Sequence, residues 1–421
     1  MSENATATAS GPARISLFVG KGGVGKSTLA AATAVHGATA GERVLVVSTD
    51  QAHSLGDVLG VAVPPTGGRD PVEVRLDDGV ADVGSLDALA LDTLALLADR
   101  WRQVAAALAA RFPDSELGSL APEELSALPG VQEVLGLHEV GELADCGRWD
   151  HVVVDCASTA DALRMLTLPG TFALYAERAW PRHRRLTAAD GATAAIALLL
   201  EGLSAGVERL TELLTDGDRV GAHLVLTAER VVAAEATRTL GSLALMGVRV
   251  DELIVNQVLL QDDSYEYHNL PAHPAFDWYA ERIAEQRTVL EELDDAIGDV
   301  ALVLAPHLPG EPIGAKALAD LLAAIRRRDG SAPPGPLRPT VERESGSGLG
   351  SVYRLRLELP QIDPGALKLG RVGDDLIIGA GGLRRRVRLA SVLRRCTVID
   401  AALRGTELTV RFQPNPEVWP R

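Results

Sequence analysis

The chain has 421 residues, enough for more than one compact domain. Its formal net charge of −16 argues against a broad nucleic-acid surface and against adhesion to anionic lipid. Three cysteines without CxxC spacing support neither a disulfide framework nor a zinc or iron–sulfur site. The first residues have no basic start and no apolar core, and no apolar run reaches membrane-spanning length. We expect a cytoplasmic protein with a disordered tail over residues 1–13, no nucleic-acid partner and no direct membrane span.

Short runs rich in Val, Leu and Ile alternate with helical patterns over residues 14–328. The expected strands are 15–19, 44–48, 151–155, 222–227, 252–256 and 301–304. Near-continuous apolar runs of this length are typical of strands buried on both faces of a parallel sheet. Leu- and Ala-rich segments at about 86–141 and 186–214 are expected to be helical insertions. The pattern predicts an α/β domain with a doubly wound, mainly parallel sheet and functional loops at the carboxyl ends of its strands.

A glycine-rich loop follows the first expected strand and precedes an Ala-rich helix. Residues 20–28 read Gly20, Lys21, Gly22, Gly23, Val24, Gly25, Lys26, Ser27 and Thr28. Such a loop wraps phosphate oxygens with backbone N–H groups at a helix N-terminus, since glycines allow a close approach. The lysine at position 26 would reach the β- and γ-phosphates, and the serine hydroxyl would ligate Mg²⁺. The motif therefore predicts a P-loop NTPase that takes ATP and Mg²⁺, with all of these residues except Lys21 as nucleotide-binding candidates.

Aspartates stand at the ends of two further expected strands. Asp50 follows the strand 44–48 and is expected to hold the water that attacks the γ-phosphate, although a structural turn role stays open. Asp155 ends the strand 151–155 and is expected to contact Mg²⁺ through water, with an exposed strand-end acid as the alternative. Asp50 is thus a catalytic candidate, while Ser27 and Asp155 are the metal candidates.

These motifs together resemble the ArsA family of arsenite-pump ATPases, which also contains the tail-anchored-protein targeting ATPases and has a deviant Walker A loop. Residues 50–54 resemble the family's Asp-Pro-Ala-His-Ser switch, with Gln51 in place of the usual proline. Residues 155–164 resemble its second switch. They agree at Asp155, Ala157, Thr159, Leu163 and Arg164, and depart at Ser158, Ala160, Asp161 and Ala162.

The resemblance implies roles for several single residues. Lys21 would cross a dimer interface and touch the partner's nucleotide as a second catalytic group, so the chain is expected to form a homodimer. Asn256 would read the adenine edge, Pro306 would pack against the base, and His53 would be a switch residue. A solvated surface lysine, a turn-capping asparagine and a packing histidine remain the alternatives for Lys21, Asn256 and His53.

Beyond residue 328 the pattern changes. A Pro- and Gly-rich linker is expected at 329–345, and strand-like alternation predicts a small antiparallel β domain over 346–421. This domain resembles the small heat-shock-protein-like domain that follows the ATPase core in many bacterial ArsA-like chains. The run Arg384, Arg385 and Arg386 is interpreted as a solvated strand face rather than a basic recognition patch.

The function that these patterns favour is a Mg²⁺-dependent ATPase that hydrolyses ATP to ADP and phosphate. The resemblance implies a nucleotide-gated dimer that drives a protein cargo or a membrane-protein partner. An arsenite or antimonite pump motor, a tail-anchored-protein targeting factor and a weakly active nucleotide-dependent scaffold remain alternatives. Cys146 and Cys156 bracket one expected strand, so a spatial pair for a metalloid is left open.

Overall fold

The computed structural model describes residues 11–50, 54–68, 70–76, 84–111, 131–157, 201, 205–206, 208–259, 273–297, 300–327, 339–359, 362–380 and 383–419. The chain divides into two compact units, the first made of 1–225 with 305–326 and the second of 226–304 with 327–421. Within the ranges just given, none of the helices combines the length and the apolar character that a membrane crossing needs.

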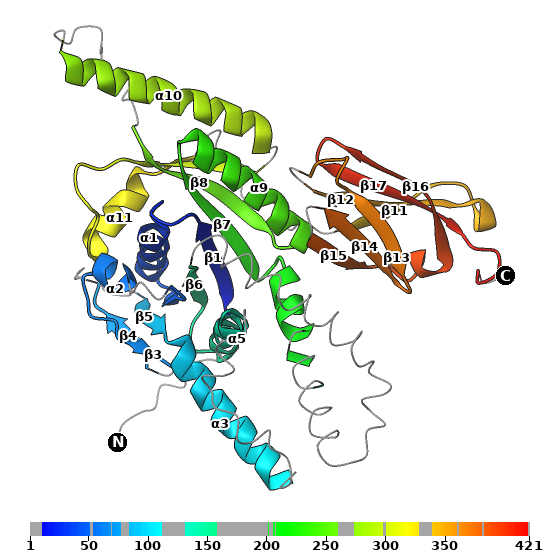
Figure 1. Ribbon diagram of the computed structural model, residues 1–421, viewed down its shortest axis with the longest axis horizontal. Coiled ribbons are helices and arrows are strands. Elements are labelled where there is room, and N and C mark those ends of the chain that lie inside the picture. The colour runs from blue at the N-terminus through cyan, green and yellow to red at the C-terminus, as the bar shows by residue number, and fades with distance from the viewer. Residues whose placement is uncertain are drawn as a thin grey trace. The chain divides into compact units, whose positions relative to one another are not determined.

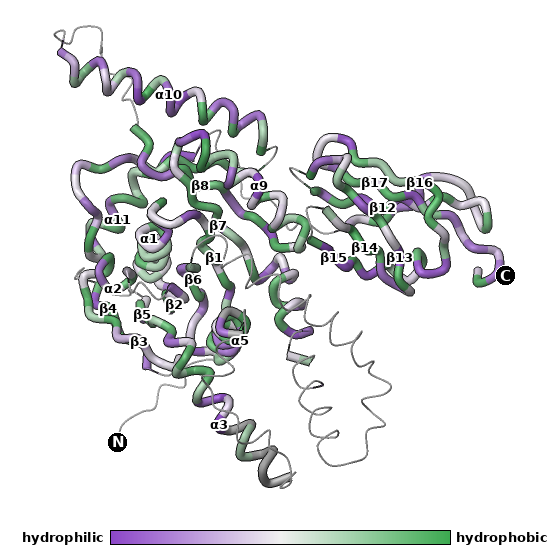
Figure 2. Tube along the Cα trace, in the orientation of Figure 1, coloured by the Kyte–Doolittle hydropathy of each residue, from purple (hydrophilic) through white to green (hydrophobic). Residues whose placement is uncertain are grey.

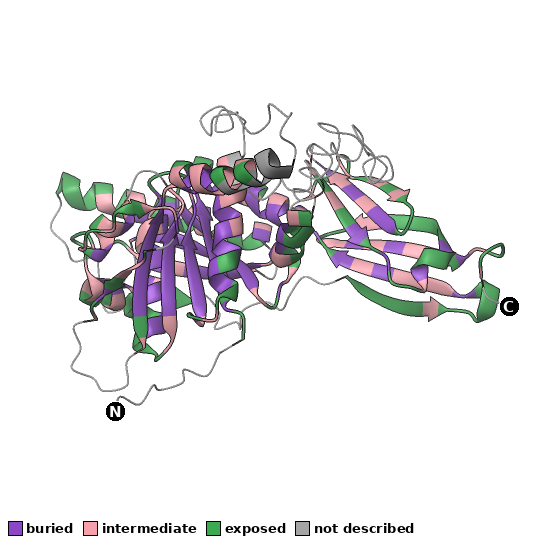
Figure 3. Ribbon diagram, turned by 90° about the horizontal axis from the view of Figure 1, so that it is seen from below, coloured by how far each residue is buried: buried purple, intermediate pink, exposed green. Residues whose placement is uncertain are grey.

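The first unit is built on a parallel sheet with the strand order β7-β1-β6-β2-β5-β3 (Figure 1). Its strands are β1 (Arg14–Gly20), β2 (Arg43–Ser48), β3 (Pro65–Thr66), β5 (Ser85–Leu91), β6 (His151–Asp155) and β7 (Val220–Thr227), while β4 (Val72–Val74) pairs antiparallel with β5. The central strands β1, β2 and β6 are almost wholly buried, as Figure 3 shows for the middle of the sheet. Runs of Val and Leu therefore form the core of this unit, because both faces of these strands are covered.

The strands of this unit are connected or covered by helices that include α1 (Lys26–Thr39), α2 (Ser54–Leu59), α3 (Thr93–Arg111), α5 (Val131–Asp145) and α11 (Ala315–Ala324). The connection through α1 goes from β1 past β6 to β2, toward the β5 side of the sheet. The connection through α5 goes from β5 past β2 to β6, in the opposite direction along the sheet. Right-handed crossovers in opposite directions place their helices on opposite faces of a sheet. Figure 1 shows α1 and α5 on the two sides of β6, which confirms the doubly wound arrangement.

The structure confirms the six expected strands, and one of the strands that it adds was expected to be helical. Residues 86–91 were expected to begin a helical insertion, but they form most of β5, and α3 begins only at Thr93. Their Leu and Ala residues favour helix locally, yet parallel pairing with β2 buries this segment and overrides that preference. Of the second expected insertion, only 201, 205–206 and 208–214 lie among the described residues, and these are helical.

The second unit contains α9 (Arg230–Met246), β8 (Val250–Val258) and α10 (Pro274–Ile297). Strands β9 (Ala301–Pro306) and β10 (Arg326–Arg327) cross the division between the units. The 24 residues of α10 alternate between hydrophilic and hydrophobic along the whole helix in Figure 2. Its buried positions, from Ile283 to Ile297, recur at helical spacing, so only one stripe of this helix faces a core.

The C-terminal part of the second unit is a two-sheet β structure. One antiparallel sheet has the order β11-β12-β17-β16 and the other has the order β13-β14-β15. The strands are β11 (Thr340–Ser345), β12 (Val352–Glu358), β13 (Lys368–Val372), β14 (Asp375–Ala380), β15 (Leu383–Arg388), β16 (Cys396–Arg404) and β17 (Glu407–Pro414), with short 3₁₀ turns at Gly348–Gly350 and Leu393–Arg395. Leu355, Ile378 and Phe412 belong to the buried cluster between the sheets. Strand β11 lies within residues 329–345, where a linker was expected. Its polar sequence lacks the apolar alternation from which a strand is predicted.

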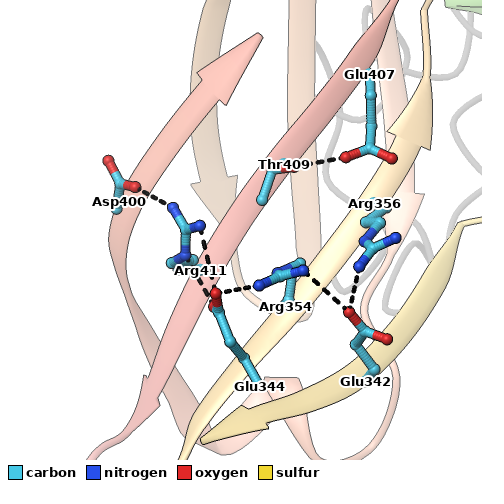
Figure 4. A network of polar contacts seen from close by, with 8 residues as sticks. All are labelled: Glu342, Glu344, Arg354, Arg356, Asp400, Glu407, Thr409 and Arg411. Atoms are coloured by element: carbon cyan, nitrogen blue, oxygen red, sulfur yellow. Dashed lines mark hydrogen bonds and ion pairs between the residues drawn. The ribbon is translucent and has the colours of Figure 1, made fainter. Parts of the chain in front are cut away.

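Charged side chains form a ladder on the four-stranded sheet (Figure 4). Glu344 on β11 accepts hydrogen bonds from Arg354 on β12 and from Arg411 on β17, and Arg411 also binds Asp400 on β16 at 2.7 Å. The two guanidinium groups hold the pKa of the Glu344 carboxyl down at about 2. The ladder thus links all four strands through cross-strand pairs, including the exposed edge strand β11.

The β domain contacts the C-terminus of α9 through Arg385. This side chain lies on β15 and donates from Nη1 to the Ala244 carbonyl oxygen at 3.0 Å. A Cβ added at Gly247, which follows α9, would lie 3.1 Å from the Arg385 guanidinium, and Leu245 joins the core cluster of the β domain. Burial lowers the pKa of Arg385 to about 10. The interpretation of residues 384–386 as one solvated face is therefore wrong for Arg385, because alternate strand residues point to opposite faces and only Arg384 and Arg386 are exposed.

Candidate functional site

The glycine-rich loop begins where β1 ends. Gly20 is the last residue of β1, and a Cβ there would lie 2.2 Å from the Val225 carbonyl oxygen, so any side chain would force the strands apart. Gly25 caps α1 with φ +92°, a left-handed conformation that suits glycine. The first turn of α1 contains no acidic residue, and its first backbone bond runs from Leu29 N to Gly25 O at 3.0 Å. The N–H groups ahead of Leu29 therefore lack intrahelical acceptors and can bind an anion.

Lys26 is held inside this loop. Its side chain is buried, and the ammonium donates to the Lys21 carbonyl oxygen at 3.3 Å. Val24 is buried as well, and Thr28 lies half-buried in the first turn of the helix. A buried ammonium is stable only with acceptors or negative charge near it. The loop thus presents one fixed positive charge beside a helix N-terminus, an arrangement that suits phosphate.

Asp155 ends β6 next to this loop and is completely buried. Its Oδ2 accepts from the Ser48 hydroxyl at 3.3 Å, whereas no residue among the described ranges hydrogen bonds to its Oδ1. Burial raises the pKa of Asp155 to about 6, Asp50 adds to this shift, and the Ser27 hydroxyl and Lys26 oppose it. The Ser27 hydroxyl itself lies 2.9 Å from that of Ser54.

This oxygen set fits Mg²⁺. A buried carboxylate oxygen without a hydrogen-bond partner is unfavourable unless a cation or water satisfies it. Mg²⁺ prefers oxygen ligands and retains part of its water shell, so the Asp155 carboxylate and the Ser27 hydroxyl have the required chemistry. Both predicted metal candidates therefore lie beside the glycine-rich loop, at the carboxyl ends of the parallel strands.

Hydrogen bonds tie the segment that carries Asp50 to the end of β6. Thr49 N donates to the Asp155 carbonyl oxygen at 3.0 Å, and Ala157 N donates to the Thr49 hydroxyl at 3.3 Å. The backbone N–H of Asp50 binds the Ser48 hydroxyl at 3.2 Å. The half-buried Asp50 thus belongs to the same cluster as Asp155 and Ser27.

Sequence reasoning gave no role of its own to three hydroxyl residues that position this cluster: Ser48, Thr49 and Ser54. The rule that functional residues gather at the carboxyl ends of parallel strands could have pointed to the first two, because Ser48 ends β2 and Thr49 follows it.

The other predicted residues are distributed over both units. Lys21 is exposed at the front of the loop, and Pro306 is the last residue of β9 in the first unit. Asn256 is buried near the end of β8, which belongs to the second unit. Gln51, Ala52 and His53 lie outside the described residues, as does the second-switch segment from Ser158 onward.

The cysteines do not form the pair that was left open. Cys146 is exposed ahead of β6, while Cys156 is buried immediately after its end. A strand of this length spans roughly 16 Å, so the strand separates the two thiols. Burial also raises the pKa of the Cys156 thiol to about 12, which keeps it protonated. No group of three or more His, Cys, Asp or Glu side chains is placed to hold a metal ion within the described part of the chain.

Comparison with known proteins relates this chain to one ATPase family along most of its length. Residues 13–327 match the ArsA ATPase family, described as anion-transporting ATPases, and residues 350–412 match the HSP20-like domain found in ArsA. The chain is 75% identical to Protein Rv2184c of Mycobacterium tuberculosis over 97% of this chain and 98% of that protein. It is 26% identical to a putative arsenical pump-driving ATPase of Chlorobaculum tepidum over 95% and 96% of the two chains. It is also 30% identical to an arsenical pump-driving ATPase of Escherichia coli, over 58% of this chain and 39% of that protein.

Proposed function

The chain belongs to the ArsA family of anion-transporting ATPases, and from this premise we propose that it is a Mg²⁺-dependent ATPase that hydrolyses ATP to ADP and phosphate. The observation that carries the proposal is the buried Asp155 carboxylate beside the loop that holds Lys26, with an Oδ1 to which none of the described residues donates a hydrogen bond. A phosphate site and a metal-binding carboxylate are the two parts that phosphoryl transfer needs.

Each residue of the site has a defined task in this proposal. The loop N–H groups and Lys26 bind the β- and γ-phosphates, while Ser27 and Asp155 would hold Mg²⁺, which would neutralise charge on those phosphates. Asp50 orients the attacking water and accepts its proton. Asn256 reads the adenine edge with one donor and one acceptor, and Pro306 packs against the base.

The proposal also includes a homodimer in the cytoplasm. Lys21 from one protomer reaches the nucleotide of the other, where it stabilises the charge that develops in phosphoryl transfer. Closure of the dimer around ATP then drives a protein cargo or a membrane-protein partner, since contacts to the γ-phosphate exist only before hydrolysis.

A pump-motor role is the second candidate, because relatives named putative arsenical pump-driving ATPases match nearly the whole chain. The separation of Cys146 and Cys156 argues against a thiol site for a metalloid built from these two residues. Stimulation of ATP turnover by arsenite or antimonite would favour the pump role, and unchanged turnover would favour another cargo.

Phosphate release by the full chain tests the proposal. We expect turnover with Mg²⁺, its loss when EDTA removes the metal, and a loss of roughly two decades or more in Lys26→Met. Lys316→Met, which removes an exposed lysine on α11, is the matched control and should retain wild-type turnover. Turnover that persists in EDTA or in Lys26→Met would contradict the assignment.

A further inference from the structure

The backbone of β8 turns into the left-handed region directly after Asn256. Gln257 has φ +58°, and it is the sole non-glycine residue with positive φ in the described part of the chain. A left-handed residue inside a strand interrupts the regular alternation of the backbone and so changes the direction of the neighbouring side chains. Non-glycine residues persist in this conformation only where the surrounding structure holds them, and they cluster at functional sites.

The group that holds this turn is the side chain of Gln286 on α10. Its Oε1 accepts from Leu259 N at 2.9 Å, and its Nε2 donates to the Gln257 carbonyl oxygen at 3.1 Å. One amide therefore binds the backbone on both sides of Val258. The side chain is only 5% exposed, so both contacts are shielded from competing water.

Gln286 is the polar exception on the buried stripe of its helix. The other buried residues of α10 are Ile283, Val289, Leu293 and Ile297. An aliphatic side chain would fill the same volume without the cost of burying an amide. The amide is therefore best explained by the two backbone groups that it satisfies, which lie next to Asn256.

We propose that Gln286 is a positioning residue for adenine recognition. It fixes the left-handed backbone at Gln257 and thereby sets the direction of the Asn256 side chain, without touching the nucleotide itself. This inference rests on the proposed function, in which Asn256 reads the base. It predicts that Gln286 contributes to the affinity for the base and not to the affinity for the phosphates.

Binding of ATP and of tripolyphosphate to the full chain separates these two contributions. Gln286→Met should weaken ATP about tenfold and tripolyphosphate less than about twofold. Gln286→Glu keeps the acceptor for Leu259 N but loses the donor to Gln257 once its carboxyl is ionised, so a loss confined to ATP that grows with rising pH is expected. In Asn256→Ala the ATP-specific loss is already present, and adding Gln286→Met should change it little.

Gln132→Met is the matched control, because Gln132 is a helical glutamine on α5 whose amide oxygen accepts from Thr93. It should leave the ratio of the two affinities unchanged. Equal weakening of ATP and tripolyphosphate by Gln286→Met, or no weakening of either, would overturn the inference. If Gln286→Met fails to fold, an affinity ratio in Gln286→Glu that stays at the wild-type value over the whole pH series overturns it equally.

Failure of the proposed function gives different results. A wild-type chain that binds neither ligand contradicts the nucleotide site as a whole. An unchanged affinity ratio in Asn256→Ala contradicts the base-reading role, and the inference about Gln286 falls with it, while the phosphate-binding loop stands.

Discussion

At the scale of single residues, the candidate site contains a carboxylate, Asp155, whose ionised form is destabilised by burial. Asp155 is fully buried, and burial raises its pKa from the ordinary 3.8 to about 6. The folded-state pKa lies above the unfolded one, so ionisation of Asp155 destabilises the metal-free protein as pH rises through this window. The full cost, on the order of 3 kcal/mol, is present above about pH 6.

Asp155→Asn should therefore stabilise the metal-free protein at pH 7, by up to about 3 kcal/mol, and should abolish Mg²⁺-dependent ATP binding. The stability difference from wild type should grow between about pH 4 and pH 6, as thermal unfolding over a pH series would measure. Because protons compete with the metal, Mg²⁺-dependent ATP binding by wild type should also weaken below about pH 6. Asp320→Asn, an exposed control on α11, should show neither effect, and a destabilised Asp155→Asn at pH 7 would refute this account.

At the scale of helices and strands, the elements that could be predicted are those whose own sequence pattern determines their structure. The strands β1, β2 and β6 and the loop around Lys26 follow directly from apolar runs and glycine spacing. Strand β5 could not be predicted, because its Leu and Ala residues favour helix until β2 pairs with them. Edge strand β11 was hidden because cross-strand ion pairs at Glu344, and not an apolar face, characterise it.

Local pattern was also insufficient for part of the candidate site. The motifs single out Asp50, Asp155 and Ser27, which lie near one another in the structure, whereas the Ser48 hydroxyl binds Asp155, a partner more than a hundred residues away. The role of Arg385 also needed the fold, because its partner is a carbonyl group on a distant helix.

The contact between β15 and α9 leads to an element-scale prediction. A cation at a helix C-terminus and its hydrogen bond to Ala244 stabilise the last turn of α9 by about 1–2 kcal/mol. Arg385→Met keeps the apolar stem and removes both effects, so hydrogen exchange over residues 240–250 should accelerate about tenfold. Arg384→Met, on the exposed face of the same strand, should leave exchange unchanged. Equal protection in the two variants would show that this contact does not hold the helix end.

At the scale of the whole molecule, the proposal requires two copies of the chain. If Lys21 acts on the partner's nucleotide, Lys21→Ala should lower ATP turnover by up to about 10³-fold, the magnitude typical of an arginine finger. Mixing Lys21→Ala with Asp50→Asn should then restore activity, since one site of the heterodimer retains both residues. Phosphate release across a series of mixing ratios measures this rescue. A mixture no more active than its two components would contradict action across the dimer.

The central claim is that this chain hydrolyses ATP with Asp50 as the residue that orients water. Its most direct test is steady-state phosphate release with Mg²⁺ for wild type and Asp50→Asn, measured together with the ATP affinity of each. The account predicts an affinity within about threefold of wild type and a turnover lower by roughly two decades or more in Asp50→Asn. Undiminished turnover in Asp50→Asn, or a loss of ATP affinity as large as the loss of turnover, would contradict it.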